Sequence, residues 1–112
     1  MSSWLPSAPR SALVARQKMY QTIREYFLQR AVLEVETPLL CAAPVADPNI
    51  TPMQVEQRWL HTSPEYAMKR MLCAGYGDIY QICKVFRDGE AGRRHNPEFS
   101  MLEWYRVGWS HR

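Results

Sequence analysis

Residues 86–105 read Phe-Arg-Asp-Gly-Glu-Ala-Gly-Arg-Arg-His-Asn-Pro-Glu-Phe-Ser-Met-Leu-Glu-Trp-Tyr, and this stretch decides the fold. The segment that leads into it, 78–86, is rich in β-branched and aromatic residues, which favour a strand. Glycine, asparagine and proline between positions 89 and 97 mark a connection. Aromatic residues then return at 99–105. The pattern predicts two strands joined as a long hairpin.

Side chains of the returning strand alternate between two faces. One face carries Phe99, Met101, Glu103 and Tyr105, and the other carries Ser100, Leu102, Trp104 and Arg106. We expect Leu102 and Trp104 to lie in the core. Four residues of strand span about 13 Å at about 3.3 Å per residue, so Phe99 and Glu103 are spaced to contact opposite ends of one extended ligand, such as an aminoacyl nucleotide.

The residue types on the first face suit a nucleotide and an amine. An aromatic ring stacks on a base, and a carboxylate with a phenol two residues on pairs with an ammonium group. Arg87 offers a planar fork for phosphate or carboxylate oxygens, and the basic turn at 93–95 adds donors for a polyphosphate. A buried strand face is the competing interpretation of Phe99 and Tyr105. Glu103 argues against it, because a buried carboxylate without a cationic partner is costly.

Two runs, Arg94-His95-Asn96-Pro97-Glu98-Phe99 and Met101-Leu102-Glu103-Trp104-Tyr105, resemble motif 2 of the class II aminoacyl-tRNA synthetases, specifically the lysyl branch. Within that branch the chain is most similar to the elongation factor P lysine ligase family, a paralogue of lysyl-tRNA synthetase. The stretch Thr62-Ser63-Pro64-Glu65 supports this choice, because lysyl synthetases resemble Ala-Pro-Glu there. The resemblance implies an α+β fold in which helices flank an antiparallel sheet, as part of a class II catalytic domain.

The N-terminal part of the chain resembles class II motif 1. Residues 11–30 space apolar side chains at helical intervals, which predicts an amphipathic helix. The β-favouring segment 32–40 contains Pro38, which suits an edge or interface strand because proline cannot donate to a ladder. In the family, motif 1 builds the dimer interface, so we expect a homodimer.

The resemblance also predicts the domain organisation of residues 1–112. Motif 1 covers about 11–40 and motif 2 about 78–107, within the N-terminal part of a catalytic domain. A helix that begins so near Met1 leads us to expect no anticodon-binding domain. We expect motif 3, and the acidic residues that hold Mg²⁺, to lie outside these 112 residues.

A short strand at 58–62 and a helix after it are predicted by turn and cap signals. Ser63 is suited to the N-cap, Pro64 to the first helical position and Gly75 to the C-terminal end. Glu65 then lies in the first turn, where the helix dipole favours a carboxylate by about 0.3–1 kcal/mol. That structural interpretation does not exclude a role in binding. The buried stripe would contain Ala67, Met68, Met71 and Leu72.

The resemblance assigns roles at the amino-acid end of the site. Arg87 matches the arginine that bridges the ATP α-phosphate and the substrate carboxylate, which makes it the candidate catalytic residue. Glu65 matches the glutamate that contacts the α-amino group, and Ser63 beside it is a further candidate for binding the substrate. Glu103 and Tyr105 match the pocket for the lysine side chain.

At the nucleotide end, the resemblance implies that Phe99 stacks on adenine. Synthetases usually have a glutamate two residues after the motif 2 arginine, where it contacts the adenine amino group, and this chain has Gly89 there. Its neighbours Asp88 and Glu90 are both candidates for that contact. The remaining candidate ATP-binding residues are Arg94, His95 and Asn96.

Composition allows one modest domain, with 46% hydrophobic residues in 112. No apolar stretch approaches the roughly 20 residues that span a bilayer, so we expect a cytoplasmic protein without membrane contact. Three cysteines without a Cys-x-x-Cys pair predict reduced packing thiols and no metal site. The net charge of +3, from 14 Lys+Arg and 11 Asp+Glu, is too small to argue for nucleic-acid binding on its own. Because we expect no anticodon-binding domain, tRNA is not an expected partner.

The leading functional hypothesis is an ATP-dependent ligase that uses Mg²⁺. It would activate lysine or β-lysine as an adenylate and transfer it to a lysine of elongation factor P. We expect the 112-residue chain alone to be inactive. One alternative is a truncated lysyl-tRNA synthetase that charges tRNA. Another is a non-catalytic, synthetase-like fragment that dimerises through motif 1, and retained ATP binding would separate it from the two enzymes.

Overall fold

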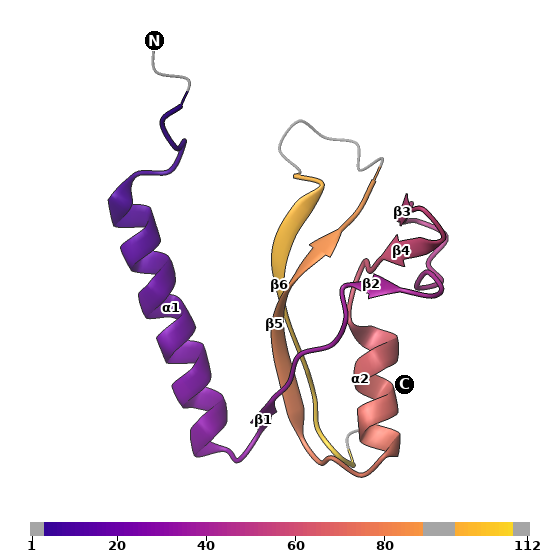
Figure 1. The fold of residues 1–112 in the computed structure, drawn as a ribbon. Coiled ribbons are helices and arrows are strands. Elements are labelled where there is room, and N and C mark those ends of the chain that lie inside the picture. The colour runs from indigo at the N-terminus through magenta and orange to yellow at the C-terminus, as the bar shows by residue number, and fades with distance from the viewer. Residues whose placement is uncertain (1–3, 89–95, 109–112) are drawn as a thin grey trace. The chain divides into compact units, whose positions relative to one another are not determined.

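The computed structural model describes residues 4–88 and 96–108 (Figure 1). The chain divides into two units, residues 1–31 and 32–112. The first contains one helix, and the second contains a short helix and strands that form two sheets. The predicted α+β class is confirmed.

Helix α1 (Arg10–Gln29) is the helix predicted for 11–30, with ends shifted by one residue. At its C-terminal end the backbone N–H of Arg30 donates to Phe27 O and that of Ala31 donates to Leu28 O, both at 3.1 Å, and Ala31 leaves the helix with a φ of 58°. The Arg30 guanidinium lies 3.6 Å from the centroid of the Tyr26 ring. Several large apolar side chains of this helix are exposed: Leu13, Met19, Tyr26 and Leu28.

The first sheet has the strand order β1 (Leu33–Glu34), β5 (Ile79–Phe86) and β6 (Glu98–Tyr105). Strands β5 and β6 pair antiparallel over their full length, from Ile79 opposite Tyr105 to Phe86 opposite Glu98. The predicted hairpin is therefore confirmed. β1 pairs parallel to β5 at the edge of the sheet, as the proline in its segment indicated.

The prediction of one strand over residues 32–40 is wrong. Only Leu33–Glu34 pairs with β5, whereas β2 (Leu40–Cys41) belongs to the second sheet. Between them, Thr37 donates its backbone N–H to the side-chain Oε1 of Gln81 at 3.0 Å. The chain leaves the first sheet there, because Thr37 bonds to a side chain and Pro38 has no N–H to donate.

The second sheet has the order β2, β4 (Arg58–Leu60) and β3 (Met53–Val55), with both pairs antiparallel. β4 corresponds to the strand predicted at 58–62. The turn between β3 and β4 includes Glu56, whose φ of 55° lies in the left-handed region. This small sheet leads directly into the second helix.

Helix α2 (Glu65–Cys73) begins one residue later than predicted, with Pro64 as N-cap. The Ser63 hydroxyl nevertheless accepts a hydrogen bond from the Glu65 backbone N–H at 3.2 Å, which satisfies one free donor of the first turn. At the other end Gly75 has a φ of 85°, a conformation that glycine adopts without a steric penalty. The predicted end of the helix near Gly75 is therefore confirmed.

The core of the second unit lies between α2 and the hairpin (Figure 1). Val35, Met68 and Ile79 are buried there, and Met71, Leu72 and Tyr105 pack against them. Three members of the predicted stripe on α2 thus contribute to the core, and Ala67 is half-buried.

Two predictions about packing are wrong. Trp104 is 46% exposed, because it lies on the face of β6 opposite Tyr105, and the core cluster packs on the Tyr105 face. Cys73 is exposed, whereas Cys41 and Cys83 are half-buried, and all three are free thiols.

Within residues 4–88 and 96–108, neither helix is long and apolar enough to cross a bilayer. The cytoplasmic location stays a prediction.

Candidate active site

The register of the hairpin places residues of both strands on one face. Val85 is opposite Phe99, Cys83 opposite Met101 and Gln81 opposite Glu103. Directly opposed residues of an antiparallel pair have their side chains on the same side. Alternation adds Arg87, just beyond β5, to this face.

At one end of the face, Tyr105 and Glu103 form a pair. The Tyr105 hydroxyl donates to Glu103 Oε2 at 2.6 Å, and both side chains are half-buried. Burial, then the hydrogen bond to Glu103 and its charge, raise the pKa of the Tyr105 phenol well above its usual value. The phenol therefore remains a donor, and it orients a carboxylate that can accept hydrogen bonds from a cation.

Helix α2 brings a second carboxylate to the same end. Glu65 and Glu103 both raise the pKa of the Tyr105 phenol through their charge. Lys69 donates to Glu65 Oε2 at 2.7 Å, and its pKa is raised mainly by this hydrogen bond, with a smaller effect of Glu103. The predicted residues Glu65, Glu103 and Tyr105 thus share one electrostatic environment, and an ammonium group of the chain itself lies within it.

Lys69 and Cys83 are residues of this region that sequence reasoning missed as site residues. The spacing of Lys69 from Glu65, four residues on a helix, was a usable signal for the ion pair. Burial, and then the charge of Glu103, raise the pKa of the Cys83 thiol to about 11. The thiol is therefore neutral near pH 7 and lines the site as a small, weakly polar group.

At the other end of the face, Arg87 is held by three contacts. Its backbone N–H donates to Pro97 O at 2.9 Å, its Nη2 donates to Thr62 O at 3.3 Å, and its guanidinium carbon lies 5.3 Å from the centroid of the Phe99 ring. Its Nε is buried and has no hydrogen-bond partner among the residues that the structure describes. An unsatisfied buried donor costs about 1–3 kcal/mol, more when it is charged, so this atom is suited to an anionic ligand.

The other predicted site residues are placed as follows. Asp88 is exposed, and its backbone N–H donates to Thr51 O at 2.9 Å. Asn96 is exposed, and the Ser63 hydroxyl accepts a hydrogen bond from the Glu65 backbone N–H. Glu90, Arg94 and His95 lie outside the described residues. The structure therefore brings together two groups: Arg87 with Phe99, and Glu65 with Glu103 and Tyr105.

No group of three or more His, Cys, Asp or Glu side chains in residues 4–88 and 96–108 is arranged to hold a metal ion. The groups that are present fit an anion at Arg87 and a cation at Glu103. An aminoacyl nucleotide carries both kinds of charge.

Comparison with known proteins identifies the family. The family model described as tRNA synthetases class II (D, K and N) matches residues 4–110. The chain belongs to this family. Membership in the class II synthetases implies that the family uses ATP, and ATP binding by this chain stays a prediction.

Relatives within the class II family make the resemblance more specific. An elongation factor P–(R)-β-lysine ligase from Mannheimia succiniciproducens is 51% identical, covering 93% of this chain and 35% of the relative. Ligases of the same name from Edwardsiella ictaluri and Haemophilus influenzae are 50% and 49% identical, each covering 95% of this chain and 36% of the relative. The chain thus spans about a third of the length of these relatives. The predicted resemblance to the elongation factor P lysine ligases is confirmed.

Proposed function

We propose that this chain is the N-terminal part of the catalytic domain of an ATP-dependent ligase. The enzyme activates β-lysine or lysine as an adenylate and transfers the acyl group to a lysine of elongation factor P. The observation that carries the proposal is the buried, unpartnered Nε of Arg87 beside Phe99, on the same strand face as the Glu103–Tyr105 pair. The names of the relatives support the amino acid and the acceptor.

The amino-acid end of the site binds the substrate by its ammonium groups. Glu103, oriented by Tyr105, accepts the side-chain ammonium. Glu65 binds the α-amino group of the substrate, which replaces Lys69 as its partner. An exposed ion pair of this kind is weak, so it is readily exchanged.

The phosphate end of the site carries the chemistry. A carboxylate oxygen of the amino acid attacks the α-phosphorus of ATP, the bond to the β-phosphate oxygen breaks, and pyrophosphate leaves. Arg87 holds the carboxylate and the α-phosphate together and stabilises the charge that develops between them, while Phe99 stacks on adenine. Mg²⁺, with ligands outside this chain, would neutralise the departing phosphates.

The second half-reaction forms an amide. The amine of the acceptor lysine attacks the carbonyl carbon of the adenylate, and AMP leaves with the bonding electrons. Glu103 and Tyr105 keep the acyl group in place throughout, because they bind the end of the substrate that does not react.

We also propose that the protein dimerises through motif 1. The exposed apolar side chains of α1, among them Met19 and Tyr26, which are seven residues apart on one helix face, supply a surface for such an interface.

The competing function is the charging of tRNA, which the family description favours. The test uses the complete ligase, meaning this chain joined to the rest of a catalytic domain of its family. We expect ATP–pyrophosphate exchange that depends on lysine or β-lysine, and stable transfer of labelled amino acid to elongation factor P. Transfer to lysine tRNA but not to the protein would replace our proposal with the competing one. Absence of ATP–pyrophosphate exchange would support the third interpretation, a non-catalytic, synthetase-like fragment.

A further inference from the structure

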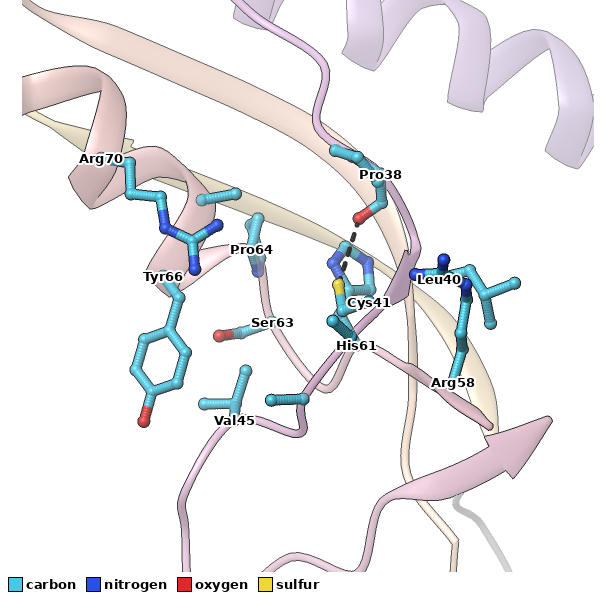
Figure 2. A pocket seen from close by; sticks show the side chains of 13 residues that line it. Pro38, Leu40, Cys41, Val45, Arg58, His61, Ser63, Pro64, Tyr66 and Arg70 are labelled. Carbon is cyan, nitrogen blue, oxygen red and sulfur yellow. Dashed lines mark hydrogen bonds between the residues drawn. The ribbon is translucent and has the colours of Figure 1, made fainter. Parts of the chain in front are cut away.

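A pocket lies beside the first two turns of α2 (Figure 2). It has a volume of about 310 Å³ and lies between the loop after β2, the end of β4 and the first two turns of α2. Tyr66 and Arg70, which are four residues apart, present one face of α2 to it, whereas Glu65 and Lys69 share the neighbouring face. The pocket is therefore adjacent to the proposed amino-acid site and shares Ser63 with its candidate residues.

The walls of this pocket are held in place by hydrogen bonds. Ala46 donates its backbone N–H to the Tyr66 hydroxyl at 3.1 Å, which ties the loop to α2. His61 is 2% exposed, and its Nε2 lies 2.6 Å from the carbonyl oxygen of Lys84. The backbone N–H of His61 donates to Leu39 O at 2.8 Å. A pocket with walls fixed in this way loses little conformational entropy when it binds a ligand.

The charges of the pocket have one sign. Arg58 and Arg70 lie on opposite sides of it, and none of the lining residues carries a carboxylate (Figure 2). Neither guanidinium forms a hydrogen bond or ion pair with another residue of the described part of the chain. Burial raises the pKa of the Cys41 thiol, and the positive charge of Arg70 partly offsets this effect. The charge of Arg70 therefore acts on a residue that lines the pocket.

The surface of the pocket is partly apolar, with contributions from Pro38, Leu40 and Val45. An apolar lining with arginine at either side fits an apolar side chain flanked by carboxylates, because arginine binds carboxylates with two parallel hydrogen bonds. A phosphodiester backbone would use the arginines and leave the apolar lining without a contact.

We propose that this pocket docks an acidic segment of the acceptor protein. The inference rests on the proposed transfer to a protein acceptor and adds the surface that holds that protein next to the adenylate. The docked segment carries an apolar residue between acidic ones. Its binding raises the local concentration of the acceptor lysine without a contact to the reacting atoms.

The test compares the double variant R58E/R70E of the complete ligase with wild type. R10E, at the exposed first turn of α1, is a control with a charge reversal elsewhere on the chain. The first probe is a fluorescein-labelled peptide, Asp-Glu-Leu-Glu-Asp, with its amide counterpart Asn-Gln-Leu-Gln-Asn as control. We expect the acidic peptide to bind wild type and R10E, and to bind R58E/R70E at least about tenfold more weakly, which is about 1.4 kcal/mol.

The second readout is catalytic. In R58E/R70E the KM for elongation factor P should rise by about tenfold, while ATP–pyrophosphate exchange changes by less than about twofold, because the docking surface acts only in the second half-reaction. Equal binding of the acidic peptide by wild type and R58E/R70E would overturn the inference. A parallel loss of ATP–pyrophosphate exchange would also overturn it, because that loss would show that the rest of the enzyme occupies the pocket. A third contradicting result would be a change in transfer to tRNA without a change in transfer to elongation factor P. If wild type shows no transfer at all, the proposed function fails, and the peptide measurement still decides whether the pocket binds acidic segments.

Discussion

The two ends of the β5–β6 hairpin face differ in how their polar groups are satisfied. At the Glu103 end, Tyr105 donates to Glu103, and Lys69 bonds to the nearby Glu65. At the Arg87 end, a buried Nε has no partner among the described residues. One end is therefore preformed with partners from the chain itself, whereas the other keeps a buried donor that is suited to an anion. The difference predicts that changes at the two ends affect different kinetic constants.

The largest effect is expected for Arg87→Ala in the complete ligase. Loss of a preorganised donor to a developing charge typically costs about 2.7–4 kcal/mol, so exchange should fall by about 10²–10³-fold. Initial rates of ATP–pyrophosphate exchange at saturating substrates measure this. Lys84→Ala, at an exposed position of the same strand, is the control and should be near wild type. An Arg87→Ala enzyme with normal exchange would remove Arg87 from the chemistry.

Glu103→Gln should act mainly on binding. The amide keeps the shape of the side chain but removes the charge that pairs with the substrate ammonium, an interaction present in ground and transition states alike. We expect the KM for lysine or β-lysine to rise by about tenfold or more, with a smaller change in kcat. The ratio of the two changes, measured by exchange at varied amino-acid concentration, is the diagnostic quantity. A loss confined to kcat would contradict the assignment.

Tyr105→Phe should have a smaller effect on the KM, since it removes the donor that orients Glu103 and leaves the carboxylate in place. It should also change the pH dependence of stability. The pKa of Tyr105 is raised in the folded protein relative to about 10 in an unfolded chain, so its contribution is complete below about pH 10 and is lost as the pH rises further. Urea denaturation of the complete ligase between pH 8 and pH 11 should show a smaller alkaline loss of stability in Tyr105→Phe than in wild type. Identical curves would contradict the raised pKa.

The smallest effect concerns thiol reactivity. Burial raises the pKa of the Cys41 and Cys83 thiols, and Cys73 is exposed. The thiolate is the reactive species, so iodoacetamide at pH 8 should modify Cys73 first and Cys83 last. Mass spectrometry of peptides at successive times gives the order. Early labelling of Cys83 would show that the hairpin face around Met101 is more open than described.

Local patterns predicted the parts of the fold that local interactions determine. Strand alternation and turn residues gave the hairpin and placed Phe99, Glu103 and Tyr105 on one face. The end of the first strand was missed, because it depends on a hydrogen bond between Thr37 and Gln81, which are 44 residues apart. The exposure of Trp104 was missed for a similar reason, since it depends on which face the α2 core cluster covers.

In the candidate site, too, the sequence predicted the residue types, whereas their contacts depended on long-range packing. Family motifs identified Arg87 and Glu103, but no pattern indicated that Arg87 Nε is left without a partner, because that depends on the packing around it. The pocket between Arg58 and Arg70 joins residues 38–45 to residues 58–70, so it becomes visible only in the folded chain.

The central claim is that the two ends of one hairpin bind the two ends of one aminoacyl adenylate. Isothermal titration of the complete ligase with lysyl-sulfamoyl adenosine, with adenosine sulfamate and with lysinol tests it directly, using Phe99→Leu and Glu103→Gln. We predict that Phe99→Leu weakens both adenosine ligands but not lysinol, and that Glu103→Gln weakens both lysine-bearing ligands but not adenosine sulfamate. Equal effects of each variant on all three ligands would contradict the division of the site.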